Sequence, residues 1–374
     1  MSTTRKKVLK TVAGILIFLF LLTTIINFLG PLLRPEGQDF DGWHYFYAED
    51  NNTINVAMIG SSAMYRYWIP AQAYEEQGFT SCMISQSCQN IRAVPYIMEE
   101  TLKSQDVDLF VVELRQVVAD LVRNENLTEE KIEKQNYYLS ILTSGMKQSK
   151  TRRKLIHELL IPTEADNELE WQIPLLKYHE NVFEISKNDW IDRFTTGKSI
   201  YKGLRVRTTV ASQEKPTIFP DAENATFPLP QKSREYIDDI VKTAEKYGKK
   251  ILFVSTPYIC EEARFPYQCA MNAYMAEKNY PYLNMEEKSV RESVNLDYSI
   301  DFYNSHHVNV VGAEKITAYL AEYMKEHYQF TDKLNEKQKK EWNNAVSAWD
   351  EKEILYRQEW NENCKQAALA EASE

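Results

Sequence analysis

Cysteine and glycine are scarce in this sequence, and their spacing argues against several kinds of site. The 374-residue chain has 5 cysteines, and none stands in a Cys-x-x-Cys pair, so neither a zinc site nor a thioredoxin-type motif is expected. The spacing leaves open whether Cys82/Cys88 and Cys260/Cys269 pair outside the cell or remain free, buried thiols. The chain has only 11 glycines, and none of them builds a glycine-rich phosphate loop.

An excess of positive charge is also absent. The chain has 44 Lys and Arg against 54 Asp and Glu, so its net charge is -10. This balance argues against a protein that binds nucleic acid. With 44% hydrophobic residues, the chain can bury an ample core in one large domain or two small ones.

One long apolar run stands at the N-terminus. Residues 11–33 carry no charge and exceed the about 20 residues that a spanning helix needs. A signal-peptide core is usually shorter and ends at a small-x-small cleavage site, which this sequence does not show. Four basic residues lie within residues 1–10, but only Arg34 follows the run closely. The positive-inside rule therefore predicts a single-pass signal anchor in the cell membrane, with residues 1–10 cytoplasmic and the rest outside.

Beyond a linker at residues 34–52, apolar runs alternate with helical patterns. The runs lack polar alternation, which is typical of strands buried on both faces, and they lie at residues 54–60, 79–84, 108–114, 250–255 and, shorter, 282–285. Helical patterns lie at residues 92–103, 233–247, 265–278 and 313–327. We therefore predict an α/β domain over residues 53–330, built on a doubly wound parallel five-stranded sheet of flavodoxin-like type.

Two regions stand outside this alternation. Residues 122–230 are charged and rich in Tyr and Trp, and they predict a mostly helical insertion that ends in a loop region. The basic run at residues 147–154 is read as a solvated helix face, or as a dock for an anionic polymer or lipid headgroups. Residues 331–374 predict a charged helical tail, in which the tryptophans pack against other helices.

The first predicted strand ends in Gly60-Ser61-Ser62, and a helical pattern follows. Gly60 is expected there because only glycine turns so tightly at no steric cost. The order strand, turn, helix puts Ser62 at the carboxyl end of a strand, where open α/β sheets bind ligands. Taken alone, such a serine belongs to a turn more often than it acts as a nucleophile.

Two adjacent histidines, His306 and His307, stand in a polar stretch before the last core helix. A serine hydroxyl is a weak nucleophile that needs a positioned base, and histidine, with an ordinary pKa of about 6.5, fills that role. An acid on the other ring nitrogen would fix the tautomer and stabilise the imidazolium. Asp301 is the nearest carboxylate upstream, although it could simply cap the loop.

The Gly-x-Ser after the first strand and the His-x-Asn-x-x-Gly before the last helix resemble the SGNH/GDSL hydrolase superfamily. The likeness covers residues 54–114 and 249–319. It is closer to the membrane-anchored bacterial branch that includes the D-alanyl transfer protein of teichoic acid synthesis. The resemblance implies that Ser62 is the nucleophile and His307 the base. A register shift of one residue would exchange His307 for His306.

The sequence departs from the family pattern at the acid. The family usually has its acid three residues before the histidine, where this chain has Asn304. Asp301 could substitute from one turn further back, or the site could work as a Ser-His dyad. A neutral Asn304 can orient the ring but stabilises its positive charge less than a carboxylate does.

The oxyanion donors depart from the pattern as well. The second family block matches residues 85–90, which have no glycine, so the resemblance moves this role to N–H groups near Ser85 or Ser87, with Asn90 in support. The asparagine of the third block is missing, and Arg115, which stands there, is a conceivable donor. Losing one such donor typically costs about 100- to 1000-fold in rate.

The resemblance implies a membrane-anchored, extracytoplasmic serine esterase or O-acyltransferase with no metal or organic cofactor. Its substrates would be acyl esters of a cell-surface polysaccharide or a teichoic-acid-type polymer. Its other expected partners are membrane lipid around residues 11–33 and a membrane-bound acyltransferase, but no nucleic acid. The alternative is a catalytically inactive SGNH-like protein that binds polymer, or assists assembly, beside a membrane acyltransferase.

Overall fold

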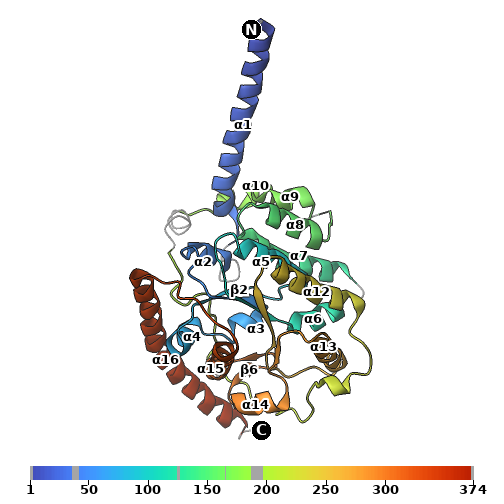
Figure 1. The fold of residues 1–374 in the computed structure, drawn as a ribbon, viewed down its shortest axis with the longest axis vertical. Helices are drawn as coiled ribbons and strands as arrows, with labels where there is room; N and C mark the ends of the chain where they lie inside the picture. Colours follow the sequence, from blue (N-terminus) through green and yellow to red (C-terminus); the bar gives the residue numbers. More distant parts are fainter. Residues whose placement is uncertain (1–2, 36–41, 124–126, 165, 187–196, 372–374) are drawn as a thin grey trace.

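A computed structural model describes residues 3–35, 42–123, 127–164, 166–186 and 197–371 of the chain. Its central sheet has five parallel strands, β1 (Val56–Gly60), β2 (Ser81–Ser85), β3 (Leu109–Glu113), β4 (Lys250–Ser255) and β5 (Tyr282–Asn284). Helices lie on both sides of this sheet (Figure 1). The predicted parallel five-stranded α/β sheet is therefore confirmed, and each strand limit lies within two residues of the prediction.

The strands follow the order β2-β1-β3-β4-β5, so the winding direction changes beside β1. Gly60 at the end of β1 pairs with Ser85 of β2, and Ile59 pairs with Val112 of β3. The carboxyl ends of the three strands therefore meet at one edge of the sheet. In open α/β sheets a crevice opens at such a switch point, and Ser62 follows β1 there.

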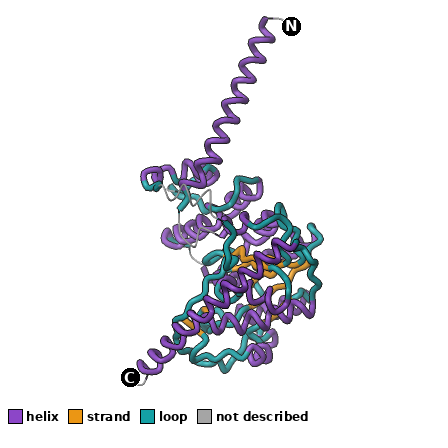
Figure 2. Tube along the Cα trace, turned by 90° about the vertical axis from the view of Figure 1, so that its left-hand side faces the viewer, coloured by secondary structure: helices purple, strands orange, loops and turns teal. Residues whose placement is uncertain are grey.

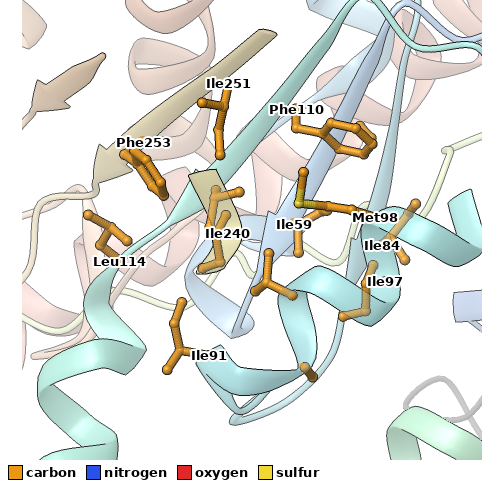
Figure 3. Packing of buried hydrophobic residues seen from close by; sticks show 14 of the residues in the cluster. Ile59, Ile84, Ile91, Ile97, Met98, Phe110, Leu114, Ile240, Ile251 and Phe253 are labelled. Atoms are coloured by element: carbon orange, nitrogen blue, oxygen red, sulfur yellow. The ribbon is translucent and has the colours of Figure 1, made fainter. Parts of the chain in front are cut away.

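Alternate residues of each strand pack into separate apolar layers, as the period of a strand requires. On one face, Ile59 packs with residues of α5 (Val94–Thr101), α12 (Gln231–Lys246) and α13 (Phe265–Lys278). Figure 3 shows part of this layer. On the other face, Met58 packs with residues of α4 (Pro70–Gln77) and α15 (Val310–His327). Because both faces are covered, the strands read as continuous apolar runs.

The N-terminal helix α1 (Thr3–Leu33) stands away from the α/β domain (Figures 1 and 2). Its segment Arg5–Gly30 is long and apolar enough to cross a membrane. The end of α1 is fastened to the domain, because Leu33 is buried and its carbonyl accepts a hydrogen bond from the Asn181 side chain at 2.8 Å. The membrane-span prediction is supported at the level of length and composition.

Short helices occupy the segments predicted as linker and insertion. The linker contains α2 (Gly42–Ala48), whose buried Trp43 and Phe46 belong to the core, so this segment is more than a spacer. The insertion is mostly helical, as predicted, and it contains α7 (Glu129–Ser144), α8 (Lys150–Leu159), α9 (Glu168–Gln172), α10 (Pro174–Lys177), η2 (His179–Phe183) and η3 (Ala222–Asn224). It follows α6 (Arg115–Arg123), and η1 (Ile91–Ala93) leads into α5.

The tail forms one 36-residue helix, α16 (Glu336–Glu371), that runs along the outside of the domain (Figure 2). Trp342 and Trp349 are 3% and 2% exposed, so the tail is packed onto the domain through its tryptophans. The predicted packing of these two side chains is confirmed.

Gly60 ends β1 for a reason different from the one that the sequence suggests. Its φ is not among the positive glycine angles, which occur at Gly78, Gly203 and Gly248. A Cβ on Gly60 would lie 2.8 Å from the Cβ of Glu113 on β3. Glycine is therefore needed at Gly60 for close approach between β1 and β3, and not for an unusual turn conformation.

A hairpin of β6 (Phe302–Asn304) and β7 (His307–Val308) precedes α15 and follows α14 (Lys288–Val294). Asn309 caps α15, since its side-chain oxygen accepts from the Gly312 N–H, while its amide donates to the Ile300 carbonyl at 2.6 Å. A Cβ on Gly312 would lie 2.6 Å from the Asp301 carbonyl oxygen and 2.7 Å from the Val308 Cβ. The Asn-x-x-Gly pattern is thus explained by the hairpin, which packs directly on the first turn of α15.

We expect Gly312→Ala to lower the free energy of unfolding by about 1–3 kcal/mol, the usual range for overpacking, even though alanine favours a helix. The added methyl group meets backbone and β-carbon atoms that cannot rotate away. Urea denaturation of the full-length protein in detergent micelles measures this. Glu322→Ala, on an exposed turn of the same helix, should stay within about 0.5 kcal/mol of the wild type. Equal stability of both variants would contradict the packing argument.

Candidate functional site

The Ser62 hydroxyl and the His307 imidazole meet although 245 residues separate them, with Oγ 2.7 Å from Nε2. Ser62 is the first residue of α3 (Ser62–Tyr65), while the preceding Ser61 serves as the cap and accepts from the Ala63 N–H. The capping bond is thus made by Ser61, and the Ser62 side chain faces the imidazole. Both residues are only partly buried, which leaves them open to a substrate.

Asn304 holds the other side of the imidazole. Its side-chain oxygen lies 3.1 Å from His307 Nδ1 and accepts a hydrogen bond from the His306 backbone N–H at 2.9 Å. A backbone N–H can only donate, so the oxygen of the amide, and not its nitrogen, must face this way. The His307 Nδ1 then carries the proton and donates to Asn304. Nε2 is left as an acceptor for the Ser62 hydroxyl, which is the tautomer that a general base needs.

The surroundings of His307 favour its neutral form. Burial, followed by the positive charges of Arg115, Arg66 and His306, lowers the pKa of His307 from 6.5 to about 2. Within the part of the chain that the structure describes, no carboxylate is among the causes of this shift. The imidazole is therefore ready to accept a proton at neutral pH, but the imidazolium that it would become has less support than in a site with an acid.

Arg115 lies behind the histidine hairpin and holds it in place. Its Nη1 donates to the His306 carbonyl at 2.6 Å, and its Nη2 donates to the Thr256 hydroxyl at 2.7 Å. The Tyr67 hydroxyl lies 2.9 Å from the same His306 carbonyl. With its side chain 7% exposed and an ion-pair contact to Glu113 at 3.7 Å, Arg115 is positioned as a structural clamp. Its two terminal nitrogens donate to these partners, and its expected role as an oxyanion donor stays a prediction.

Asp301 is placed away from the imidazole. Its carboxylate forms an ion pair with Lys315 at 2.6 Å and accepts from the Asp297 backbone N–H at 2.7 Å. The expectation that Asp301 supports the base is therefore wrong. The group beside His307 Nδ1 is the Asn304 side chain. The physical reason is the short hairpin, which aims the Asn304 side chain at the ring. Asp301 instead anchors the loop that leads into the hairpin.

The neighbouring histidine, His306, turns away from Ser62. Its Nε2 lies 3.4 Å from a carboxylate oxygen of Glu261, and the imidazole is 38% exposed. The two adjacent histidines thus have separate environments, since His306 lies in the turn of the hairpin and His307 begins β7. The register that pairs Ser62 with His307 is the one that the structure adopts.

Ser85, Ser87 and Asn90, whose backbone N–H groups or side chains were expected to support the oxyanion, lie at and after the end of β2, and that role stays a prediction. Ser85 is buried and donates to the Met58 carbonyl at 3.1 Å, so its hydroxyl belongs to the sheet. The Ser87 hydroxyl lies 2.8 Å from that of Tyr65, on the turn that carries Ser62. Asn90 caps η1, since its side-chain oxygen accepts from the Arg92 N–H at 2.9 Å. Of these three residues, Ser87 is the one linked to α3.

Two residues that the sequence reading passed over border the pair. The Tyr303 ring stacks on His307, with ring centroids 5.3 Å apart and an interplanar angle of 10°. The Arg66 guanidinium lies 5.5 Å from the centroid of the Tyr303 ring. Arg66 follows Ser62 by one helical turn, and Tyr303 precedes His307 in the hairpin. Their proximity to the two expected site residues is the signal that could have found them.

Neither a protein-family model nor a curated protein matches this chain. Among the described residues, no group of three or more His, Cys, Asp and Glu side chains is placed to hold a metal ion. All five cysteines are free thiols. The chemistry that the arrangement can offer rests on the geometry of Ser62, His307 and Asn304.

We expect Asn304→Asp to raise the pKa of His307, because a carboxylate on Nδ1 stabilises the imidazolium. In the wild type, His307 should stay neutral well below pH 6.5, the ordinary histidine value. NMR titration of the imidazole resonances measures this without any need for turnover. His157, whose pKa is raised by its contact with Glu168, gives an internal reference. A wild-type His307 that titrates near pH 6.5 would contradict the electrostatic argument.

Proposed function

We propose that this chain is a membrane-anchored, extracytoplasmic serine esterase or O-acyltransferase. The observation that carries the proposal is the 2.7 Å contact between Ser62 Oγ and His307 Nε2, with Asn304 on the opposite ring nitrogen. A serine, a neutral base and a group that orients the base are the arrangement that activates a hydroxyl for attack on an acyl carbonyl. The position at the switch point of the sheet supports the same conclusion.

In the proposed reaction, the Ser62 oxygen attacks the carbonyl carbon of an acyl ester while its proton moves to His307 Nε2. The imidazolium then gives this proton to the leaving alcohol, and an acyl-Ser62 ester remains. Water or an acceptor hydroxyl, deprotonated by His307, attacks that ester and regenerates the serine. The Ser62 backbone N–H lies in the first turn of α3, where N–H groups lack intrahelical acceptors, and would donate to the oxyanion.

The substrate class follows from the anchor and the likeness to membrane-anchored SGNH proteins. The α1 helix would hold the domain at the membrane surface, so the proposed substrates are acyl esters of a cell-surface glycan or a teichoic-acid-type polymer. The proposed topology puts residues 1–10 in the cytoplasm and the domain outside. A membrane-bound acyltransferase is the proposed partner that would supply acyl groups.

A second candidate function is supported by Asn304. Its amide is uncharged, so the imidazolium gains less stabilisation than from an acid, and the glycine-free stretch at residues 85–90 weakens the case for oxyanion donors. On this alternative, the chain is a catalytically inactive SGNH-like protein that binds polymer or assists assembly beside a membrane acyltransferase.

A fluorophosphonate probe tests the nucleophile. We expect the full-length protein to be labelled covalently and the Ser62→Ala variant to remain unlabelled, because the phosphorus is attacked only by an activated hydroxyl. Gel fluorescence and mass spectrometry of the labelled peptide report the outcome. Ser61→Ala, which removes the neighbouring hydroxyl at the cap, is the matched control and should keep labelling. Labelling that persists in Ser62→Ala would exclude this residue as the nucleophile.

The hydrolysis of p-nitrophenyl acetate separates the two candidate functions. We expect Asn304→Asp to increase turnover at least about tenfold, since one pKa unit of extra stabilisation of the imidazolium corresponds to that factor. The acid limb of kcat/KM should move to higher pH, because His307 must be neutral to act and its pKa rises. In a serine-histidine-aspartate site, an amide in place of the acid can impose the wrong tautomer and lower kcat about 10⁴-fold. The gain in turnover here should be smaller than that, because Asn304 already accepts from Nδ1.

Asp301→Asn is the matched control for this experiment. Its carboxylate pairs with Lys315, so the substitution should lower stability but leave the acid limb in place. If neither the wild type nor Asn304→Asp turns over the ester, and both retain binding to a glycan polymer, the inactive alternative is favoured.

A further inference from the structure

A cavity of about 520 Å³ opens beside the candidate site, and three arginines line it. Arg66 follows α3, whereas Arg205 and Arg207 come from the extended segment at residues 203–208. The C-terminal helix α16 contributes Trp349, Lys352, Tyr356 and Glu359. Among the described residues, the lining thus has four cationic side chains and one carboxylate.

The segment at residues 203–208 lines the cavity along its whole length, including Arg205 and Arg207. Leu204 and Val206 of the same segment also pack against the apolar layer on the α15 face of the sheet. The segment is anchored to both halves of the candidate site. The Arg205 N–H donates to the Tyr65 carbonyl at 3.0 Å, and the Val310 N–H donates to the Arg207 carbonyl at 2.7 Å.

Cations and aromatic rings alternate from this cavity to His307. The Arg205 guanidinium lies 4.8 Å from the centroid of the Tyr65 ring, and Arg66 lies 5.3 Å from the same centroid. Arg66 then lies 5.5 Å from the Tyr303 ring, which stacks on His307. A single aromatic ring, that of Tyr303, therefore separates an arginine of the cavity wall from the base.

The positive charges of Arg205 and Arg207 act on Arg66 from close by. Burial lowers the pKa of Arg66, and Arg207 and Arg205 lower it further, against an opposing effect of the neighbouring tyrosines. The Arg66 Nε is buried and has no hydrogen-bond partner among the described residues. Because the chain as a whole carries a net charge of -10, the cluster is not part of a generally basic surface. A bound anion would relieve the repulsion.

We propose that Arg66, Arg205 and Arg207 form a pocket for an oxyanion, phosphate or carboxylate, of a polyanionic acceptor polymer. The inference rests on the proposed function and narrows its substrate to a polymer with repeated negative charges. Guanidinium groups bind such oxyanions through paired, charge-assisted hydrogen bonds. The partly buried Tyr356 ring, which also lines the cavity, lies against the uncharged part of the polymer. A polymer held here presents its next unit to Ser62, beyond the Tyr303 ring.

Titration calorimetry with inorganic phosphate tests the pocket. The full-length protein is used in detergent micelles with Ser62→Ala, so no turnover takes place. We expect Arg207→Gln to weaken phosphate binding about tenfold, which corresponds to the loss of one charged hydrogen bond. Arg66→Gln should weaken it as well, and Arg207→Lys should restore part of the affinity because it keeps the charge but not the paired donors.

Arg153→Gln is the matched control, since Arg153 is an exposed arginine on α8, and it should bind phosphate as the parent does. Phosphate binding that is equal in Arg207→Gln, Arg66→Gln and the parent would overturn the proposal. A parent protein that shows no phosphate binding would overturn it too.

Three polymers identify the source of the anion: poly(glycerol phosphate), polygalacturonate and the neutral dextran. We expect one polyanion to bind more tightly than inorganic phosphate, with an affinity that falls as salt is added, and dextran to bind weakly. The preferred polyanion shows whether phosphate or carboxylate is the natural group. Dextran that binds as tightly as both polyanions would overturn the assignment of an anionic acceptor.

The phosphate-binding experiment tests the pocket, and the probe-labelling experiment tests the nucleophile, so either proposal can be overturned while the other stands. If Ser62 is not labelled but Arg207→Gln still weakens phosphate binding, the proposed enzyme falls and the pocket remains as part of the polymer-binding alternative. If Ser62 is labelled and Arg207→Gln binds phosphate as the parent does, only the pocket proposal falls.

Discussion

One carbonyl oxygen, on the side chain of Asn304, organises the candidate site. It accepts from the His306 backbone N–H and from His307 Nδ1 at the same time. The first of these bonds sets the direction of the amide, and the second sets the tautomer of the imidazole. Only with that tautomer can Nε2 accept from the Ser62 hydroxyl. The orientation of the serine, the base and the hairpin therefore depends on a group that is polar but uncharged.

Because Asn304 is uncharged, the positive charges around His307 are not offset at its Nδ1 side. In a site with a carboxylate, negative charge offsets the neighbouring cations, but here Arg115, Arg66 and His306 all oppose protonation. Arg115 is nevertheless required by the geometry, since its guanidinium fastens the His306 carbonyl to the end of β4 through Thr256. The same residue thus orders the hairpin and depresses the pKa of the base. Arg66 also has two sides, one toward Tyr303 and one toward the arginine cavity.

The fold was largely predictable from the apolar pattern. Strands buried on both faces need uninterrupted apolar runs, and segments such as LFVVE at β3 could therefore be found to within two residues. The pairing of Ser62 with His307 was expected only from the resemblance to the SGNH/GDSL pattern, because His307 lies in the β6–β7 hairpin and not on a strand of the parallel sheet. The choice between Asp301 and Asn304 was not predictable, since it depends on the direction in which a short hairpin points its side chains. The arginine cavity was missed because its walls come from Arg66 after α3, from residues 203–208 and from α16, which are far apart in the sequence.

The sequence by itself determined the parallel sheet, the apolar N-terminal helix and the helical tail, because periodicity and hydrophobicity act within each segment. Only the tertiary structure decided that Gly60 admits the Glu113 side chain, that Lys315 takes the Asp301 carboxylate and that Asn304 orients His307. These outcomes depend on distances between atoms that no local pattern encodes. A hydrogen bond or an ion pair forms only within about 3–4 Å, and packing of the whole chain sets which groups come that close.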